Sequence, residues 1–252
     1  MVELKRIVKF LDEYLKIKDI KDTSWNGLQV EGKSEIKKIV FAVDAGIETF
    51  EKAIQEKADM IIVHHGHFWK EGDPAIKEGS KERIELLLKN NISLYAAHLP
   101  LDRHKEVGNN AQLLKILDAK IKEEFAEHDG QNVGWIGELK KPKSITEIEK
   151  LINSKLKTKS TILPFGKEKI KTIAVCSGGG GYPTLFEALN KKVDLYLTGD
   201  AIEVYHSVKD AKINVIFAGH HTTETVGVQA LSEIIKKEFD VETVFIDIPT
   251  GL

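Results

Sequence analysis

The fold of this chain is set by residues 39–66, IVFAVDAGIETFEKAIQEKADMIIVHHG. An apolar run leads through a loop into a segment with apolar residues at helical spacing, and a second apolar run follows. Runs that are apolar at every position are typical of parallel strands with helices on both faces. The stretch therefore predicts a β-strand, an α-helix and a second, parallel β-strand that ends in a loop carrying polar side chains.

A similar stretch occurs at residues 173–200, IAVCSGGGGYPTLFEALNKKVDLYLTGD, which aligns with the first at an offset of 134 residues without a gap. The similarity resumes where YAAHLPLD, residues 95–102, matches IFAGHHTTE, residues 216–224. Two pairs of side chains face each other in this alignment, His98 with His220 and Asp102 with Glu224. The chain is therefore predicted to be duplicated.

Other short apolar runs predict the remaining strands, and amphipathic segments between them predict the helices. The expected strands are residues 39–43, 60–63, 93–97, 172–176, 194–197 and 214–218, and the expected helices are residues 48–57, 81–90, 110–117, 182–191 and 223–239. This pattern predicts an α/β fold of two similar, duplicated lobes, residues 1–125 and 126–252, with mainly parallel strands flanked by helices. Residues 125–171 finish or link the lobes, and Ser144 and Glu147 have capping-box spacing.

The composition excludes several classes of protein. A chain of 252 residues can bury a core without disulfides, and its single cysteine, Cys176, lies in an apolar run typical of a buried thiol. The N-terminal segment mixes charges with helically spaced apolar residues, unlike a signal peptide or a membrane span. These features indicate a cytoplasmic protein that does not enter membranes.

The net charge of −2 gives no general attraction to nucleic acids, but lysines are concentrated between Lys140 and Lys171, with 10 lysines and 3 acidic residues. Such a segment is either a solvated face or a surface that contacts a polyanion such as nucleic acid.

Histidines and carboxylates follow the apolar runs in the pattern of a metal site. The candidate ligands are His64, His65, Asp102, His220 and Glu224. Imidazole and carboxylate groups together bind divalent Zn, Fe, Mn, Co or Ni. Three histidines and two carboxylates exceed the needs of one catalytic zinc, and they suffice for two ions if Glu224 bridges them. The sequence thus predicts a metal site between the lobes that holds two ions.

Local geometry gives further expectations for these residues. Adjacent strand residues point to opposite faces, so His64 and His65 share a site only if the strand has ended and Gly66 allows a turn. Asp102 is expected in a loop because it follows Pro100. Gly219 permits a bend, Thr222 or Thr223 is expected to cap the next helix, and Glu224 then falls in its first turn.

Other residues are secondary candidates. His98 is the catalytic candidate, either as a partner of the ligands or as a proton shuttle. His67, His206 and His221 either orient ligands and substrate or have ordinary packing and surface roles, and His104 and His128 have no assignment. The glycines of SGGGGY, residues 177–182, either bind a phosphate or serve a tight turn between strand and helix.

Six motifs spread over the chain resemble the NIF-three-like proteins, often called GTP cyclohydrolase 1 type 2 homologues. They are SWNGLQVEG (24–32), VHHGHFW (63–69), AHLPLD (97–102), NVGWIGEL (132–139), YLTGD (196–200) and AGHHTTETVGVQAL (218–231). The resemblance extends nearly end to end and matches the short form of the family, without an inserted middle domain. The chain differs at His67, where an apolar or aromatic residue is more usual.

The resemblance implies a dinuclear metal centre on the same five residues, with Glu224 as the bridge. It also implies two interlocked α/β lobes that assemble into hexameric toroids. One expected function is a metal-dependent hydrolase, cyclohydrolase-like, that acts on a nucleotide or another phosphorylated small molecule. The alternatives are a ring-forming regulatory or nucleic-acid-binding protein with a structural metal site, and a protein for metal storage or delivery.

Overall fold

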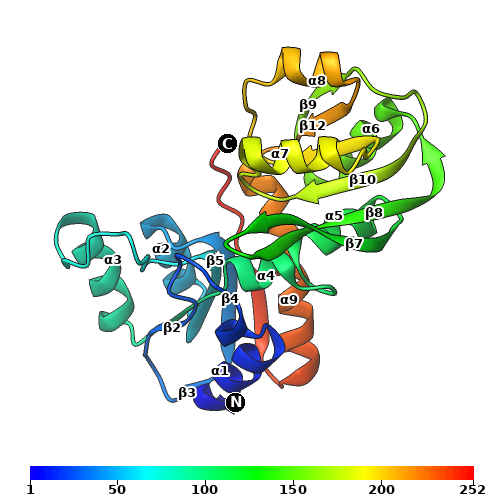
Figure 1. Ribbon diagram of the computed structural model, residues 1–252. Coiled ribbons are helices and arrows are strands. Elements are labelled where there is room, and N and C mark those ends of the chain that lie inside the picture. Colours follow the sequence, from blue (N-terminus) through cyan, green and yellow to red (C-terminus); the bar gives the residue numbers. More distant parts are fainter. The chain divides into compact units, whose positions relative to one another are not determined.

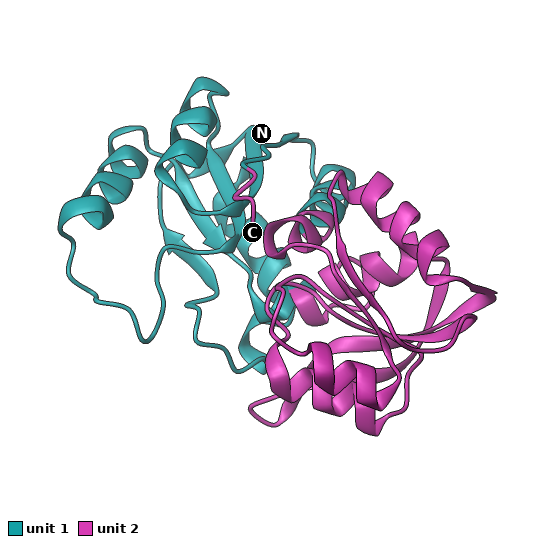
Figure 2. Cartoon of the chain, turned by 90° about the horizontal axis from the view of Figure 1, so that it is seen from above, with its two compact units in different colours: residues 1–101, 228–248 teal, residues 102–227, 249–252 magenta.

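The computed structural model describes all 252 residues, and they form two compact units. Unit 1 contains residues 1–101 and 228–248, and unit 2 contains residues 102–227 and 249–252 (Figure 2). The boundary predicted near residue 125 falls inside strand β7 (Ala119–His128), which pairs with β8 (Gln131–Lys143). This continuous hairpin belongs to unit 2, which the chain enters at Asp102.

Unit 1 is built on a five-stranded sheet with the strand order β13-β4-β5-β6-β2 (Figure 1). These strands are β13 (Glu242–Phe245), β4 (Lys38–Asp44), β5 (Met60–His65), β6 (Ser93–Ala96) and β2 (Gly27–Val30). The first four run parallel, and β2 is antiparallel at the edge. A separate short pair joins β1 (Val2–Glu3) to β3 (Glu35–Ile36). The parallel strands predicted for this half of the chain are confirmed.

Helices cover both faces of this sheet, which explains why its strands are apolar at every position. They are α1 (Leu4–Tyr14), α2 (Ile47–Gln55), α3 (Glu78–Lys89) and the later part of α9 (His220–Glu238), with a short 3-10 helix η1 (Ile17–Asp19) after α1. On one face, Phe50 of α2 and Leu87 of α3 share a buried cluster with strand residues such as Val40. On the other, the Tyr95 hydroxyl donates to Asp12 of α1 at 2.8 Å.

Unit 2 is built on a six-stranded sheet with the order β7-β8-β10-β11-β12-β9. Its other strands are β9 (Thr161–Pro164), β10 (Ile170–Cys176), β11 (Leu195–Thr198) and β12 (Asn214–Phe217). Only β10, β11 and β12 run parallel, and the remaining pairings are antiparallel. The prediction of mainly parallel strands is therefore wrong for unit 2, because residues 119–143 form a hairpin that extends the sheet.

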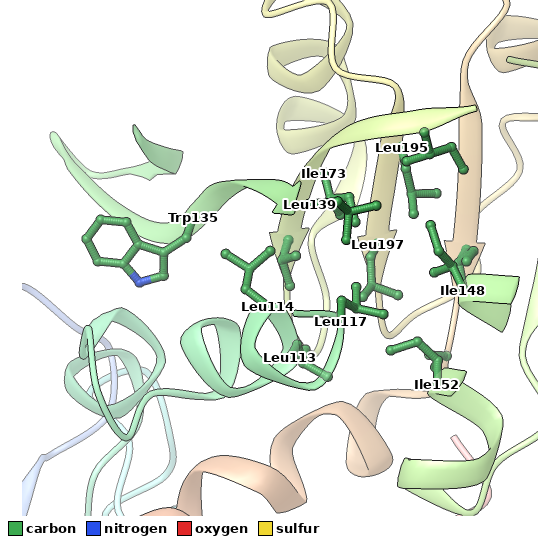
Figure 3. Close-up of a cluster of buried hydrophobic side chains, with 14 of the residues drawn as sticks. Leu113, Leu114, Leu117, Trp135, Leu139, Ile148, Ile152, Ile173, Leu195 and Leu197 are labelled. Carbon is green, nitrogen blue, oxygen red and sulfur yellow. The ribbon is translucent and has the colours of Figure 1, made fainter. Parts of the chain in front are cut away.

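The helices of unit 2 are α5 (Asn109–Ile116), α6 (Ile145–Leu156), α7 (Gly181–Asn190), α8 (Tyr205–Ala211) and the first part of α9. Figure 3 shows Leu113, Leu114 and Leu117 next to strand residues such as Leu197 in one buried cluster. The predicted capping box of α6 is confirmed, because Ser144 and Glu147 bond to each other's backbone amides. No helix in the chain is long and apolar enough to cross a membrane.

An aspartate has the same role in each sheet. The Asp59 carboxylate accepts from the backbone amides of Lys37 and Lys38, and the Asp194 carboxylate accepts from those of Lys171 and Thr172. The equivalent amides, those of Lys38 and Thr172, are 134 residues apart, whereas Asp59 and Asp194 are 135 residues apart. The gap-free alignment of the two stretches is therefore wrong by one residue at the aspartates. The second stretch has one extra residue between Thr172 and Asp194. A common origin of the two stretches stays a prediction.

Candidate metal centre

Unit 1 brings three histidines together at the end of its central strand. The nitrogen ligand atoms of His64, His65 and His98 lie within 4.8 Å of one another. His64 and His65 are both part of β5, so the predicted turn before them is wrong. Pairing with β6 stops at Val63 while pairing with β4 continues to His65, and at this strand end the two rings lie 4.6 Å apart between centroids.

Each histidine of this cluster is held through Nδ1. His64 is fully buried and its Nδ1 lies 2.9 Å from the backbone carbonyl oxygen of Ala97. The Nδ1 of His65 lies 2.8 Å from an Asp44 carboxylate oxygen. Since a carbonyl or carboxylate oxygen only accepts, Nδ1 carries the proton and Nε2 carries the lone pair. This tautomer is the one that binds a metal through Nε2.

Asp22 holds the third histidine in the same way. The Nδ1 of His98 lies 2.9 Å from Asp22 Oδ1, and the backbone amide of Leu99 donates to the same carboxylate. Burial raises the pKa of Asp22, but the hydrogen bond and charge of His98, with bonds from Asn26 and Ser24, outweigh burial and lower this pKa to about 2. Asp22 is thus a permanent anion beneath His98.

Gly66 and Trp69 complete the wall around these rings. A Cβ on Gly66 would lie 2.6 Å from the Ala96 side chain and 2.4 Å from Gln29 Nε2, so glycine is needed here for space. The strand ends at His65 and the chain bends at His67, and Gly66 between them has no positive φ. The Trp69 ring packs edge-on against His98 at 5.0 Å, and its Nε1 donates to the Gly66 carbonyl.

Asp102 belongs to unit 2 and is nearly buried, at 6% exposure. It lies in the short helix α4 (Leu99–Arg103), so the predicted loop is wrong. Pro100 is near the start of that helix, where its missing amide breaks no helical hydrogen bond. The Asp102 Oδ1 accepts from Asn109 Nδ2 at 2.8 Å and from the Ser177 hydroxyl at 2.9 Å. Two neutral donors therefore fix the carboxylate's orientation.

His220 and Glu224 lie one turn apart on α9. The helix begins at His220, directly after Gly219, whose φ of +93° confirms the predicted bend. Thr222 and Thr223 are therefore inside the helix and do not cap it, and Glu224 lies in the second turn, so both predictions are wrong. The His220 Nε2 is 3.3 Å from Glu224 Oε1, and the ligand oxygens of Glu224 and Asp102 are within 4.8 Å of each other.

Two carboxylates hold His220. Its Nδ1 lies 3.0 Å from Asp200 Oδ1, on the opposite side of the ring from Glu224. The hydrogen bond to Glu224 is the largest effect on the pKa of His220 and raises it. Burial lowers this pKa, but the charge of Glu224 and the contact with Asp200 raise it further, to about 9. The ring is therefore a cation at neutral pH. A metal bound to Nε2 takes the place of that proton, because only neutral imidazole binds metals.

The glycine loop before α7 packs directly on these ligands. A Cβ on Gly178, whose φ is +59°, would lie 2.2 Å from Glu224 Oε1 and 3.0 Å from His220 Nε2. The Gly178 amide donates to Thr223 Oγ1, and the Ser177 amide donates to Asn110 Oδ1. The glycines therefore permit close approach to the carboxylate, which favours the turn interpretation over the phosphate-binding one.

The remaining predicted residues have different surroundings. The His67 Nε2 lies 3.1 Å from the Ser80 hydroxyl, and its pKa is lowered by burial and by Arg83, as fits a packing role. His206 packs against Tyr205 on exposed α8, and His221 is buried in unit 2. The His104 Nδ1 accepts backbone amides of its own loop, and His128 is exposed. Cys176 is a buried thiol, as predicted.

Sequence reasoning missed the carboxylates that hold the rings. Asp44 directly follows the apolar run 39–43, and Asp200 lies two residues after strand β11, so both had the same signal as the ligands themselves. Each lies at the end of a strand that neighbours the strand before its histidine. Asp22 gave no such signal, because it is 76 residues from His98.

The residues present fit divalent metal ions. Four histidines have Nδ1 beside an acceptor oxygen, which sets Nε2 as the coordinating atom in all of them. Asp102 and Glu224 are buried carboxylates that face each other, an arrangement that a cation stabilises. Imidazole and carboxylate donors suit Zn, Fe, Mn, Co or Ni rather than calcium.

The chain matches a known protein family over nearly its whole length. The family model for Duf34/NIF3 (NGG1p interacting factor 3) matches residues 2–251. The chain belongs to the Duf34/NIF3 family. The resemblance seen in the sequence is thereby confirmed.

Similar members of the family include proteins named GTP cyclohydrolase 1 type 2 homolog. The one from Pyrococcus horikoshii is 48% identical over 98% of both chains, and the one from Archaeoglobus fulgidus is 45% identical over the full length of both. Among solved structures, the ybgI protein is similar over the whole of both chains, with a TM-score of 0.92 and 36% identity. These similarities show the family and a mixed α/β fold with two sheets.

Proposed function

We propose that this protein is a dinuclear metal-dependent hydrolase that acts on a nucleotide or another phosphorylated small molecule. The proposed ligands are His64, His65, Asp102, His220 and Glu224, with Glu224 as the bridge. The observation that carries the proposal is the acceptor oxygen beside the Nδ1 of each histidine ligand, which leaves Nε2 for a metal. Chain connectivity supports it, because Asp102 directly follows the last residue of the first segment of unit 1.

Bound divalent ions would polarise a carbonyl or phosphoryl oxygen of the substrate and activate water for attack. The chain supplies the remaining functions. Asp44, Asp200 and the Ala97 carbonyl orient the ligand rings. His98 accepts or donates a proton at Nε2, while Asp22 stabilises its charged form. The name that family members share, GTP cyclohydrolase 1 type 2 homolog, is consistent with a nucleotide as substrate.

The first test measures metal content and turnover in the same variants. Glu224→Gln and Asp102→Asn each remove one carboxylate charge and are expected to reduce bound metal and to abolish hydrolysis of the best substrate in a nucleotide panel. Glu233→Gln is the matched control, because this exposed glutamate lies on the same helix. If turnover survives complete removal of metal, the proposed metal-dependent hydrolysis is excluded.

His98 requires a separate variant. His98→Gln is expected to keep the metal content and to lower turnover about 100-fold or more, as expected for loss of a proton-transfer group. Loss of one metal ion from this variant would instead make His98 a ligand.

The lysine-rich segment gives limited support to the nucleic-acid alternative. Lys140 pairs with Asp118, Lys167 pairs with Asp194, and Lys171 pairs with Glu138. These charges are neutralised within unit 2. Exposed Lys141 and Lys155 make no ion pair. If the protein binds nucleic acid through this segment, the binding depends on salt, and charge reversal at these two lysines should abolish it. A hexameric ring stays a prediction, which the solution mass of the protein tests.

A further inference from the structure

Unit 2 contains a cavity of about 740 Å³ at the carboxyl ends of β11 and β12. Ligands of open α/β sheets bind at this edge. The walls come from the end of α6, the start of β9, the loops after β11 and β12, the start of α9 and residues 249–252. The volume is in the range of pockets that hold small organic ligands. No role has been assigned to this cavity in the proposed hydrolase.

Two lysines give the cavity its charge. Lys157 and Lys159 line it and are exposed, and neither forms an ion pair, in contrast to Lys167 and Lys171 of the same segment. The acidic groups in the wall are the Asp200 carboxylate, which is engaged with His220, and the carboxylate at Leu252. Lys157 and Lys159 therefore contribute two positive charges that form no ion pair within unit 2.

Helix α9 adds to this positive potential. Its first residues, including His221 and Thr222, line the cavity, and it continues for 19 residues. The amides of a first helical turn have no acceptor within the helix and carry the positive end of its dipole. The hydroxyls of Thr158 and Thr222 both donate to the Ala218 carbonyl, so they are not the donors for a ligand. Lysines and helix amides together suit a phosphate group.

The rest of the wall is apolar. Ile202, Phe217, Pro249 and Leu252 line the cavity beside the charged groups. A phosphate alone would leave this surface bare, whereas a nucleotide or sugar phosphate has a body that covers it. Asp200 connects the cavity to the metal ligands, because the same carboxylate lines the cavity and holds the Nδ1 of His220.

We propose that this cavity binds the phosphate of a phosphorylated small molecule through Lys157 and Lys159 and so anchors the substrate beside His220. The inference rests on the proposed function for its place in catalysis, but the binding itself requires no metal. The residues that anchor the phosphate are separate from the five proposed ligands, so the two roles can be tested independently.

The experiment measures binding of pyrophosphate and AMP to the metal-free protein by calorimetry, with adenosine as the ligand that lacks phosphate. Both phosphates are expected to bind and adenosine to bind more weakly. The double variant Lys157→Gln/Lys159→Gln is expected to weaken phosphate binding about tenfold or more, since it removes two charged donors. The control Lys150→Gln/Lys155→Gln changes two lysines of α6 that lie outside the cavity and is expected to have no effect.

The proposal is overturned if neither phosphate binds, if adenosine binds as tightly as AMP, or if both double variants bind alike. Circular dichroism checks that the variants fold, and binding to Glu224→Gln separates the two proposals. If that variant keeps phosphate binding while no substrate is ever hydrolysed, the hydrolase fails and the phosphate site stands. If hydrolysis depends on metal but not on Lys157 and Lys159, the phosphate site fails alone.

Discussion

Gly178 is the residue at which backbone geometry bears most directly on the proposed metal site. Its positive φ places the chain against Glu224, where a Cβ would come within 2.2 Å of Oε1. We expect Gly178→Ala to displace the Glu224 carboxylate and to weaken metal binding about 10- to 100-fold, as loss of a ligand's supporting contacts does. Metal titration of the purified variant measures the effect.

Gly130 provides the control for Gly178. It also has a positive φ, at +81°, but a Cβ there would meet nothing within 4 Å. Gly130→Ala therefore carries a similar backbone strain of about 1–2 kcal/mol without any contact with a ligand. If the two variants bind metal with equal affinity, backbone strain alone, and not the close approach to Glu224, explains the effect of Gly178→Ala.

Asp22 tests whether His98 depends on its buried partner. The carboxylate accepts from the His98 ring and from backbone amides of Ser24 and Leu99, so Asp22→Asn places an amide NH₂ against groups that donate. We expect turnover to fall about 10- to 100-fold while metal content is kept. Asp19→Asn, an exposed neighbour in the sequence, is expected to change neither. Unchanged turnover in Asp22→Asn would mean that His98 transfers no proton.

At the residue scale, the sequence indicated the candidate ligands but not their surroundings. His64, His65 and His220 stand out because they are imidazoles close to a glycine at the ends of apolar runs. Asp22 reaches the site through tertiary contacts, and nothing in its own neighbourhood signals this. Ser177 directly follows the apolar run 172–176, but this position does not indicate its hydrogen bond to Asp102. Local geometry was predicted less well, because tertiary packing decides whether a strand continues through His65 and where the helix before Glu224 begins.

At the scale of elements, Asp59 and Asp194 each join the starts of two neighbouring parallel strands. Burial raises the pKa of each carboxyl, but lysine and backbone hydrogen bonds outweigh it and lower both pKa values below the ordinary 3.8. The charged form therefore stabilises the fold. This stabilisation is complete above pH 3.8 and is lost as the pH falls below that value.

We expect Asp59→Asn and Asp194→Asn each to destabilise the protein by about 1.5–3 kcal/mol at neutral pH, as for loss of hydrogen bonds to a charged group. The difference from the unaltered protein should shrink below about pH 4, because protonation then removes the same charge. Urea unfolding at several pH values above and below about pH 4 measures this difference in the free energy of unfolding. Asp210→Asn, at an exposed position, is the control. A difference that is constant with pH would contradict the ionic role.

The elements themselves were largely predictable. Strands with both faces covered consist of apolar residues throughout, so β4, β5, β10 and β11 are evident from composition alone. The hairpin of β7 and β8 was missed because β7 is rich in charged residues and largely exposed, as an edge strand can be. A strand with such a sequence has no buried periodicity from which to predict it.

At the scale of the whole molecule, the proposed ligands are divided between the two units. The sequence predicted two lobes because it contains two similar stretches. It did not predict that the chain would leave unit 1 within α4 and return within α9, because helical periodicity continues across both crossings. Asp102 lies at the first crossing, and Glu224 lies three residues before the last unit 2 residue of α9.

This division leads to the last prediction. Because the proposed metals take ligands from both units, metal binding should stabilise both. A free metal concentration of 100 times the Kd contributes about 2.7 kcal/mol, which corresponds to roughly 100-fold slower hydrogen exchange through global opening. We expect removal of metal to accelerate exchange in β4 of unit 1 and in β10 of unit 2 alike, and Glu224→Gln to abolish the difference in both. Acceleration confined to one of these strands would mean that a single unit binds the metal, and the shared centre would then be wrong.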